Sequence, residues 1–323
     1  MGQARIALLS NPRSTGNLSQ LPRIRAFCAE HPDIFHYEVE KADQIGQALK
    51  TIARIRPKIL VINGGDGTVQ SALTELHNGG HFGSEVPPVA VLPNGKTNLI
   101  ALDLGAHGDP VAALKQLMDM ARGDLASHVV ARELIALRTS VGGPPVIGMF
   151  LGGAGLADTM LYCRDKIYPL GLPNGVSHVI TAIAVLLRQL LGLKARFLPG
   201  GAMPLQVRVR RDGSLSGRFA LLAVTTLEKL LLGSEVRSTG QGPLKLLAIE
   251  ERPSSILRGL WAGLAGRLGK TQFAGVHVQE TDEISIEGDQ SSVILDGEMF
   301  QTGIGKPIHL TPASPLSFVR LAA

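Results

Sequence analysis

Cysteine is scarce in this chain of 323 residues, where Cys28 and Cys163 are the only two. Two cysteines cannot form the disulfide framework of a small secreted domain, and the nine dispersed histidines lack zinc-ligand spacing. Aromatic residues make up 4% of the chain, too few for platforms on which nucleic-acid bases stack. These absences argue against a disulfide scaffold, a zinc site and nucleic acid as a partner.

Long apolar runs are also missing. No run approaches the roughly 20 residues of a membrane-spanning helix, and the first residues lack the apolar stretch of a signal peptide. The net charge of +5 suits weak attraction to phosphates or to an anionic membrane. The charges are scattered rather than gathered in a basic stripe, which is typical of an ordinary solvated surface. We therefore expect a cytoplasmic protein, and the positive charge leaves peripheral contact with the inner face of the membrane open.

Residues 1–125 alternate apolar strand patterns with helix patterns. Strands are predicted at Ile6–Leu9, Phe35–Val39, Ile59–Ile62 and Val89–Leu92, and helices at Leu18–Ala29, Gln44–Ile55, Val69–His77 and Pro110–Ala121. Such alternation predicts an α/β domain, in which helices cover both faces of a parallel sheet. Ligands of such sheets bind at the carboxyl ends of the strands.

Residues 126–323 predict a second domain, a mainly antiparallel β-sandwich. Whether its last strand returns to the first domain is left open. Its strands are expected at Glu133–Arg138, Val146–Leu151, Leu205–Arg210, Phe219–Val224, Leu244–Ile249, Val276–Gln279, Glu283–Glu287 and Val293–Leu295. Two helices interrupt them, an amphipathic one at Val176–Leu193 and a second at Ser254–Leu268. Trp261 in the second helix is expected in the core rather than at a membrane interface.

A glycine-rich turn links the buried strand Ile59–Ile62 to the helix after it. The turn reads Gly64-Gly65-Asp66-Gly67-Thr68. Glycines let the backbone approach a phosphate closely, and the helix N-terminus adds a positive dipole end. Asp66 places a carboxylate there, suited to holding Mg²⁺ or orienting an acceptor hydroxyl. The turn predicts phosphate chemistry.

A second pair of carboxylates lies near the C-terminus, in Asp296-Gly297-Glu298. On a strand, residues two apart point to the same face, so Asp296 and Glu298 are expected to converge on one site. One carboxylate then accepts a hydroxyl proton while the other positions the hydroxyl or a metal. The alternative is a β-turn formed by Asp-Gly with a solvated glutamate.

Together these motifs resemble those of the diacylglycerol kinase catalytic family, which is related to the sphingosine kinases. The resemblance includes the segment Asn11-Pro12-Arg13-Ser14-Thr15-Gly16-Asn17 after the first strand and Pro93-Asn94-Gly95-Lys96-Thr97-Asn98 after the fourth. It implies an ATP-dependent lipid kinase that uses Mg²⁺ in phospholipid metabolism, with diacylglycerol or a related lipid as acceptor. It implies catalytic roles for Asp66, Asp296 and Glu298, with Asp66 also as metal ligand. The nucleotide would lie against Asn11, Arg13, Ser14, Thr15, Gly16, the glycine turn Gly64–Thr68, Gly95, Lys96, Thr97 and Asn98.

Some positions depart from the family pattern. Lys96 stands where the family has a threonine, and Gln241 replaces an aspartate linked to a structural metal in bacterial members. Residues 90–97 also fit a relaxed phosphate-loop pattern, but Pro93 removes an N–H from it. Two alternatives therefore stay open: an NAD kinase-like enzyme, and a lipid-binding or regulatory protein with weak catalysis. A homodimer is also left open.

Overall fold

The computed structural model describes residues 6–95, 98–139, 142–162, 203–210, 213–227, 242–289, 292–301 and 303–321. The chain divides into two compact units. The first unit comprises Met1–Ala136, Pro144–Met149 and Ala313–Ala323, and the second comprises Leu137–Gly143 and Phe150–Pro312. Strands β5 (Val129–Thr139) and β16 (Ile308–Val319) have residues in both units.

The first unit is built on a parallel sheet with the strand order β2-β1-β3-β4, next to which the end of β16 pairs with β4 through Phe318 and Val89. Its strands and helices are β1 (Ile6–Ser10), α1 (Asn17–Glu30), β2 (Ile34–Glu38), α2 (Ile45–Ile55), β3 (Ile59–Asn63), α3 (Asp66–Asn78), β4 (Val89–Val91), α4 (Leu99–Asp103), α5 (Pro110–Arg122) and β6 (Val146–Gly148). Every residue of β1 and β3 is buried, as expected for strands covered on both faces.

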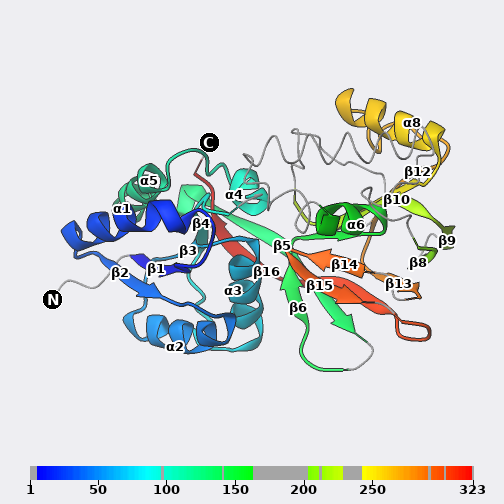
Figure 1. Ribbon diagram of the computed structural model, residues 1–323. Coiled ribbons are helices and arrows are strands. Elements are labelled where there is room, and N and C mark those ends of the chain that lie inside the picture. Colours follow the sequence, from blue (N-terminus) through cyan, green and yellow to red (C-terminus); the bar gives the residue numbers. More distant parts are fainter. Residues whose placement is uncertain are drawn as a thin grey trace. The chain divides into compact units, whose positions relative to one another are not determined.

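Helices lie on both sides of this sheet. In Figure 1, α1 and α5 lie on one side, where they contact each other, and α2 and α3 lie on the other. The predicted α/β fold is confirmed. One boundary was wrong, because α3 begins at Asp66 rather than Val69 and so takes the second half of the glycine turn into its first helical turn. The short helix α4 was not predicted.

The second unit contains a six-stranded antiparallel sheet and the antiparallel part of a ten-stranded sheet. The six-stranded sheet has the order β12-β11-β10-β7-β14-β15, and in the antiparallel part of the ten-stranded sheet the start of β16 is followed by β13, β8 and β9. Their strands are β7 (Phe150–Gly153), β8 (Leu205–Val209), β9 (Gly213–Gly217), β10 (Phe219–Thr225), β11 (Leu244–Glu250), β12 (Val276–Thr281), β13 (Ile284–Gly288), β14 (Ser292–Leu295) and β15 (Glu298–Gln301). The predicted antiparallel second domain is confirmed, although its single predicted strand at 146–151 is two strands, β6 and β7.

Two helices of the second unit fall within the described residues, α6 (Gly155–Tyr162) and α8 (Pro253–Leu264). The predicted helix Val176–Leu193 lies outside them. Trp261 on α8 is 50% exposed, so the expectation of a core position was wrong. No helix in the described part of the chain is long and apolar enough to cross a membrane.

Candidate active site

Three polar loops follow the carboxyl ends of β1, β3 and β4. The first begins at Asn11, the second at Gly64 and the third after Leu92. Because β3 pairs in parallel with both β1 and β4, the three strands end at the same edge of the sheet. Predicted residues that are far apart in the sequence are therefore brought together within the first unit.

Three buried asparagines join these loops. The Asn94 side-chain amide donates to the side-chain oxygens of Asn17 and Asn63, at 2.8 and 2.7 Å. The Asn17 amide in turn donates to the backbone carbonyls of Asn11 and Asn63, at 2.7 and 3.1 Å. All three side chains lie in residues no more than 3% exposed, where hydrogen-bonded amides are strongly favoured over unsatisfied ones. The asparagine network fixes the three loops relative to one another.

The asparagine network extends to β2 through Ser10 and His36. The Asn63 amide donates to Ser10 Oγ at 2.9 Å, and Ser10 Oγ lies 2.8 Å from His36 Nε2. Since Ser10 accepts from Asn63, its own O–H is available to donate to a neutral His36 ring. Burial lowers the pKa of His36; Glu38 opposes this shift and Arg25 adds to it. The neutral imidazole is thus the form that suits the network.

Glycines allow the loops to approach backbone to backbone. A Cβ added at Gly16 would lie 2.5 Å from the carbonyl oxygen of Asn94. One added at Gly95 would lie 3.2 Å from the Cα of Gly65 and 3.0 Å from Asn98 Oδ1. Gly95 also donates its N–H to Asn98 Oδ1 at 2.6 Å. Larger residues at 16 or 95 would push the loops apart.

Gly65 differs from these glycines because it faces open space. A Cβ there would meet nothing within 4 Å, although the backbone is ordinary extended chain with φ −82° and ψ 176°. Gly65 precedes α3, and its carbonyl accepts the N–H groups of Thr68 and Val69. The positive end of the 13-residue helix α3 therefore opens beside the half-buried Asp66. Such a helix end attracts phosphate.

The remaining predicted residues of the first loop have varied surroundings. Asn11 donates to Thr68 Oγ1 at 2.9 Å, which ties the first loop directly to the glycine turn. Ser14 Oγ donates to the Asn11 carbonyl, and Thr15 is exposed. The Arg13 guanidinium forms a 2.8 Å ion pair with Glu40 on the surface. In the third loop, Lys96 and Thr97 lie outside the described residues.

Comparisons with known proteins agree with this geometry. Residues 5–127 match the model of the diacylglycerol kinase catalytic domain. The match confirms the predicted family resemblance. It covers the part of the chain that carries all three loops.

Solved structures show the same fold over nearly the whole chain. A candidate diacylglycerol kinase from Bacillus anthracis str. Sterne shares 16% identity at a TM-score of 0.65, and the match covers 98% of this chain and 97% of that one. A crystal structure described as a diacylglycerol kinase from the same organism shares 15% identity at a TM-score of 0.56, over 98% and 97% of the two chains. At these identities the likeness establishes the fold. No curated protein matches the sequence.

Asp296 and Glu298 belong to the second unit, and their predicted arrangement was wrong. Asp296 and Gly297 form the two-residue turn of a hairpin, because Leu295 at the end of β14 pairs with Glu298 at the start of β15. Their φ angles are +42° and +95°, which is the left-handed backbone of such turns. The two carboxylates therefore do not project from one face of a strand.

The Asp296 turn is closed against β7. The Asp296 N–H donates to the Phe150 carbonyl, and Asp296 Oδ1 accepts the Phe150 N–H, both at 3.0 Å. Asp296 is 7% exposed, whereas Glu298 is exposed. A buried carboxylate that accepts a backbone N–H anchors the hairpin to the sheet, and this role was not visible in the sequence.

A magnesium ion at Asp66 would need further ligands from the substrate. Within the described residues, no group of three or more His, Cys, Asp or Glu side chains is placed to hold a metal. Mg²⁺ is commonly held by one or two protein carboxylates together with substrate phosphates and water. A single carboxylate at a phosphate-attracting helix end suits a magnesium ion that arrives with a nucleotide.

Sequence patterns assigned no role to the residues that hold the loops, namely Ser10, Asn17, His36, Asn63 and Asn94, although Asn17 and Asn94 lie in the two segments that carry the family resemblance. Their roles depend on contacts between residues that are distant in the sequence. The two hydrogen bonds between asparagine side chains join residues 31 and 77 positions apart. One signal was present, because the fully buried strands β1 and β3 both end in a polar residue. A buried polar residue requires a partner, so Ser10 and Asn63 pointed to a network.

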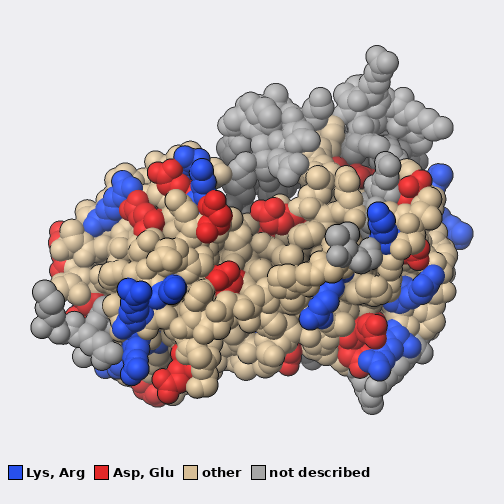
Figure 2. All heavy atoms as spheres, turned by 90° about the horizontal axis from the view of Figure 1, so that it is seen from below, with Lys and Arg blue, Asp and Glu red and all other residues tan. Residues whose placement is uncertain are grey.

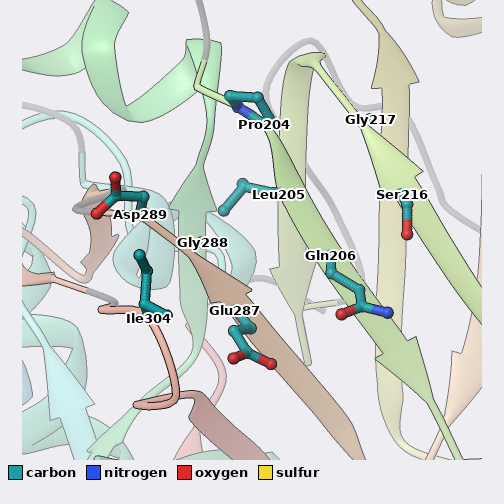
Figure 3. Close-up of a pocket in the computed structure, with 9 residues that line it drawn as sticks. All are labelled: Pro204, Leu205, Gln206, Ser216, Gly217, Glu287, Gly288, Asp289 and Ile304. Atoms are coloured by element: carbon teal, nitrogen blue, oxygen red, sulfur yellow. The ribbon is translucent and has the colours of Figure 1, made fainter.

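The second unit also has an open hollow of about 410 Å³ that contains none of the predicted site residues. Figure 3 shows Gln206 of β8 between Ser216 of β9 and Glu287 of β13, its partners on the two neighbouring strands. The Glu287 carboxylate accepts the Gly305 N–H at 3.0 Å and lies 3.4 Å from the Arg208 guanidinium. Its charge is already compensated by these two contacts.

On the face shown in Figure 2, basic and acidic side chains are interspersed.

Proposed function

We propose that this protein is an ATP-dependent kinase that transfers the γ-phosphoryl group to a hydroxyl of diacylglycerol or a related lipid. The observation that carries the proposal is the set of three loops joined by Asn17, Asn63 and Asn94, with Gly65 and the start of α3 facing open space. A rigid polar framework beside an accessible helix N-terminus is what phosphate binding requires.

Phosphoryl transfer needs positioning and charge stabilisation more than covalent chemistry by the protein. The acceptor oxygen forms a bond to the γ-phosphorus, the bond from that phosphorus to the β,γ-bridging oxygen breaks, and ADP leaves. The N–H groups at the start of α3 stabilise the phosphates, and Asp66 orients the acceptor hydroxyl or ligates magnesium. Bound Mg²⁺ supplies positive charge against the phosphate oxygens.

The proton of the acceptor hydroxyl passes to a carboxylate in this proposal. Asp296 is one candidate, and its Oδ1 accepts the Phe150 N–H at 3.0 Å. Glu298 is the other candidate, and its exposed side chain is less constrained. A positioned base contributes roughly 10²- to 10⁴-fold to such a step, so the two residues are separable by mutation.

The lipid acceptor is favoured by the family resemblance, which rests on residues 5–127. A lipid acceptor is consistent with a cytoplasmic protein that acts at the inner face of the membrane. An NAD kinase-like activity and a weakly catalytic lipid-binding protein are the competing functions, and a test of acceptors decides among them.

The test is incubation of the purified protein with γ-labelled ATP, Mg²⁺ and separate acceptors: diacylglycerol, monoacylglycerol, a sphingoid base and NAD. Transfer of label to one of the lipids, abolished in Asp66→Asn, supports the proposal. Label in NAD alone, or in no acceptor while the protein remains folded, contradicts it. Mass spectrometry of the product identifies which hydroxyl is phosphorylated.

A further inference from the structure

Helix α8 carries large apolar side chains on its outer face. Leu257, Leu260, Trp261 and Leu264 follow the spacing i, i+3, i+4 and i+7, which places them on one side of a helix. They are 52%, 45%, 50% and 79% exposed, respectively. We call these four residues the α8 stripe. Exposed apolar side chains are ordinary when single, but a continuous stripe marks an interaction surface.

The side of α8 opposite the α8 stripe is already packed against the core of the second unit. Ile256 and Ala262 belong to a buried cluster that includes Ile249 of β11. Gly259 is buried there too, where an added Cβ would lie 2.5 Å from Ile249 Cδ1. Rotating the helix to bury the stripe would break this close packing. The stripe is therefore a second apolar face.

The segment that carries the α8 stripe has a net positive charge. From Arg252 to Gln279 the sequence contains no aspartate or glutamate. Four cations in this segment are exposed: Arg252, Arg258, Arg267 and Lys270. Arg252 lies 3.3 Å from Glu250, just before the segment, so its charge is partly compensated. The surface around α8 thus combines apolar area with a local excess of cations, which matches an anionic partner.

Trp261 links the apolar and the cationic parts of this surface. The Arg267 guanidinium lies 5.0 Å from the centroid of the Trp261 ring, and Phe273 meets that ring edge to face at 5.8 Å. The ring is thereby held in place while half of the residue stays exposed. An anchored tryptophan beside arginine is well suited to the boundary between lipid headgroups and acyl chains.

We propose that α8 docks this protein on an anionic lipid bilayer. The α8 stripe enters the boundary between headgroups and acyl chains, and Arg258, Arg267 and Lys270 approach the lipid phosphates and carboxylates. This is the geometry of an interfacial amphipathic helix, whose binding combines apolar burial with attraction to anionic lipid. A stable protein partner would require about 800 Å² from each side, more than four partly exposed side chains provide.

The docking surface is inferred from α8 itself, but its purpose rests on the proposed function. A kinase whose acceptor is a membrane lipid has to reach that lipid from water. Docking places the second unit at the membrane surface and raises the local concentration of acceptor. Membrane binding is measurable without ATP, so the two proposals are separable.

The test is sedimentation of the full chain with vesicles of phosphatidylcholine alone and of equal parts phosphatidylcholine and phosphatidylserine, without nucleotide. We expect binding to the anionic vesicles that weakens as salt is raised. Leu264→Asp, at the most exposed stripe position, is expected to weaken binding about tenfold or more. Lys270→Gln is expected to weaken it roughly fivefold, because one cation is lost near the surface.

Ile304→Asp is the matched control, because Ile304 is also 79% exposed and lies outside α8. It should bind vesicles as wild type does. The docking proposal is overturned if wild type does not bind anionic vesicles, or if a folded Leu264→Asp binds them equally well. It is also overturned if Leu264→Asp acts only by dissociating a dimer seen in light scattering. Vesicle binding without any kinase activity supports docking and contradicts the proposed function; turnover of a soluble short-chain acceptor without vesicle binding does the reverse.

Discussion

An aspartate followed by glycine occurs in a turn of each unit, and the two turns use it in opposite ways. Asp66 begins helix α3, is half-buried, and follows a glycine that faces open space. Asp296 lies in a left-handed hairpin turn, is buried, and accepts the Phe150 N–H. The same dipeptide thus begins a helix at the proposed phosphate site of the first unit and anchors a hairpin in the second unit.

The element that follows the dipeptide decides between these uses. After Gly67 the chain continues as a helix, so the positive end of the helix dipole lies at this turn, where it attracts an anion. After Gly297 the chain returns as β15, so the turn groups serve the hairpin and its contact with β7. A carboxylate at the start of a helix is placed to act on a ligand, whereas a carboxylate in the hairpin turn is placed to stabilise the fold.

The largest expected effect is on turnover in Asp66→Asn. The amide keeps the size of the side chain but removes its charge, so the metal and the acceptor hydroxyl lose their anionic partner. Turnover should fall by roughly 10²- to 10⁴-fold, with the thermal midpoint nearly unchanged. Initial rates and thermal unfolding measure the two quantities. Asp43→Asn, at an exposed position of the same unit, is the control and should keep wild-type rates.

Asp296 offers a sharper test, because two substitutions separate anchoring from catalysis. Asp296→Ala leaves the Phe150 N–H without its acceptor and should lower the free energy of unfolding by about 1–3 kcal/mol. Asp296→Asn retains an oxygen acceptor and tolerates left-handed backbone, so its stability should stay near wild type. Denaturant unfolding and initial rates distinguish them. Wild-type turnover in a stable Asp296→Asn would assign Asp296 to the fold alone.

A matched pair of glycines tests the same contrast at the backbone. Gly297→Ala forces a Cβ onto a φ of +95° and should cost about 1–2 kcal/mol of stability. Gly65→Ala fits its extended backbone and meets no atom within 4 Å, so stability should be preserved. Its methyl group does occupy the space proposed for phosphate, so KM for ATP should rise severalfold. The comparison fails if Gly65→Ala destabilises the protein while its KM is unchanged.

A smaller effect is expected from His36, which supports the asparagine network through Ser10. Its pKa is lowered below the ordinary 6.5, chiefly by burial, so the unfolded chain binds its proton more readily. The corresponding stability is fully present above pH about 6.5 and is lost as pH falls through the folded-state pKa. Thermal midpoints across this range should fall on acidification in wild type. The His36→Gln variant should lack this part of the pH dependence.

The alternation of elements in the first unit was predictable from the sequence. The apolar runs of β1 and β3 predicted the sheet, and the glycines after β3 predicted the position of the glycine turn. The start of α3 was missed because Gly65 and Gly67 disfavour helix interiors, although a glycine is acceptable before the first turn and an aspartate within it. At this position helix propensity predicted a later start of the helix, whereas the residue preferences of helix N-termini are compatible with a start at Asp66.

The remaining features required contacts that periodicity does not report. The asparagine network joins Asn17 to Asn94 across 77 positions, and no local pattern predicts that pairing. At Asp296-Gly297 the hairpin signal was present, but a strand was inferred because the catalytic interpretation needed both carboxylates on one face. The left-handed preference of Asp-Gly decided the local structure instead. Strand β16 was missed because Pro312 and Pro315 interrupt its pattern.

Binding of the ATP phosphates by the three loops of the first unit is measurable by amide hydrogen exchange of the full chain with and without ATP and Mg²⁺. We expect slower exchange in residues 11–17, 64–69 and 94–98 when nucleotide is bound, with much weaker protection in Gly65→Ala. Unchanged exchange in all three loops at saturating ATP, or protection confined to other segments, would contradict it.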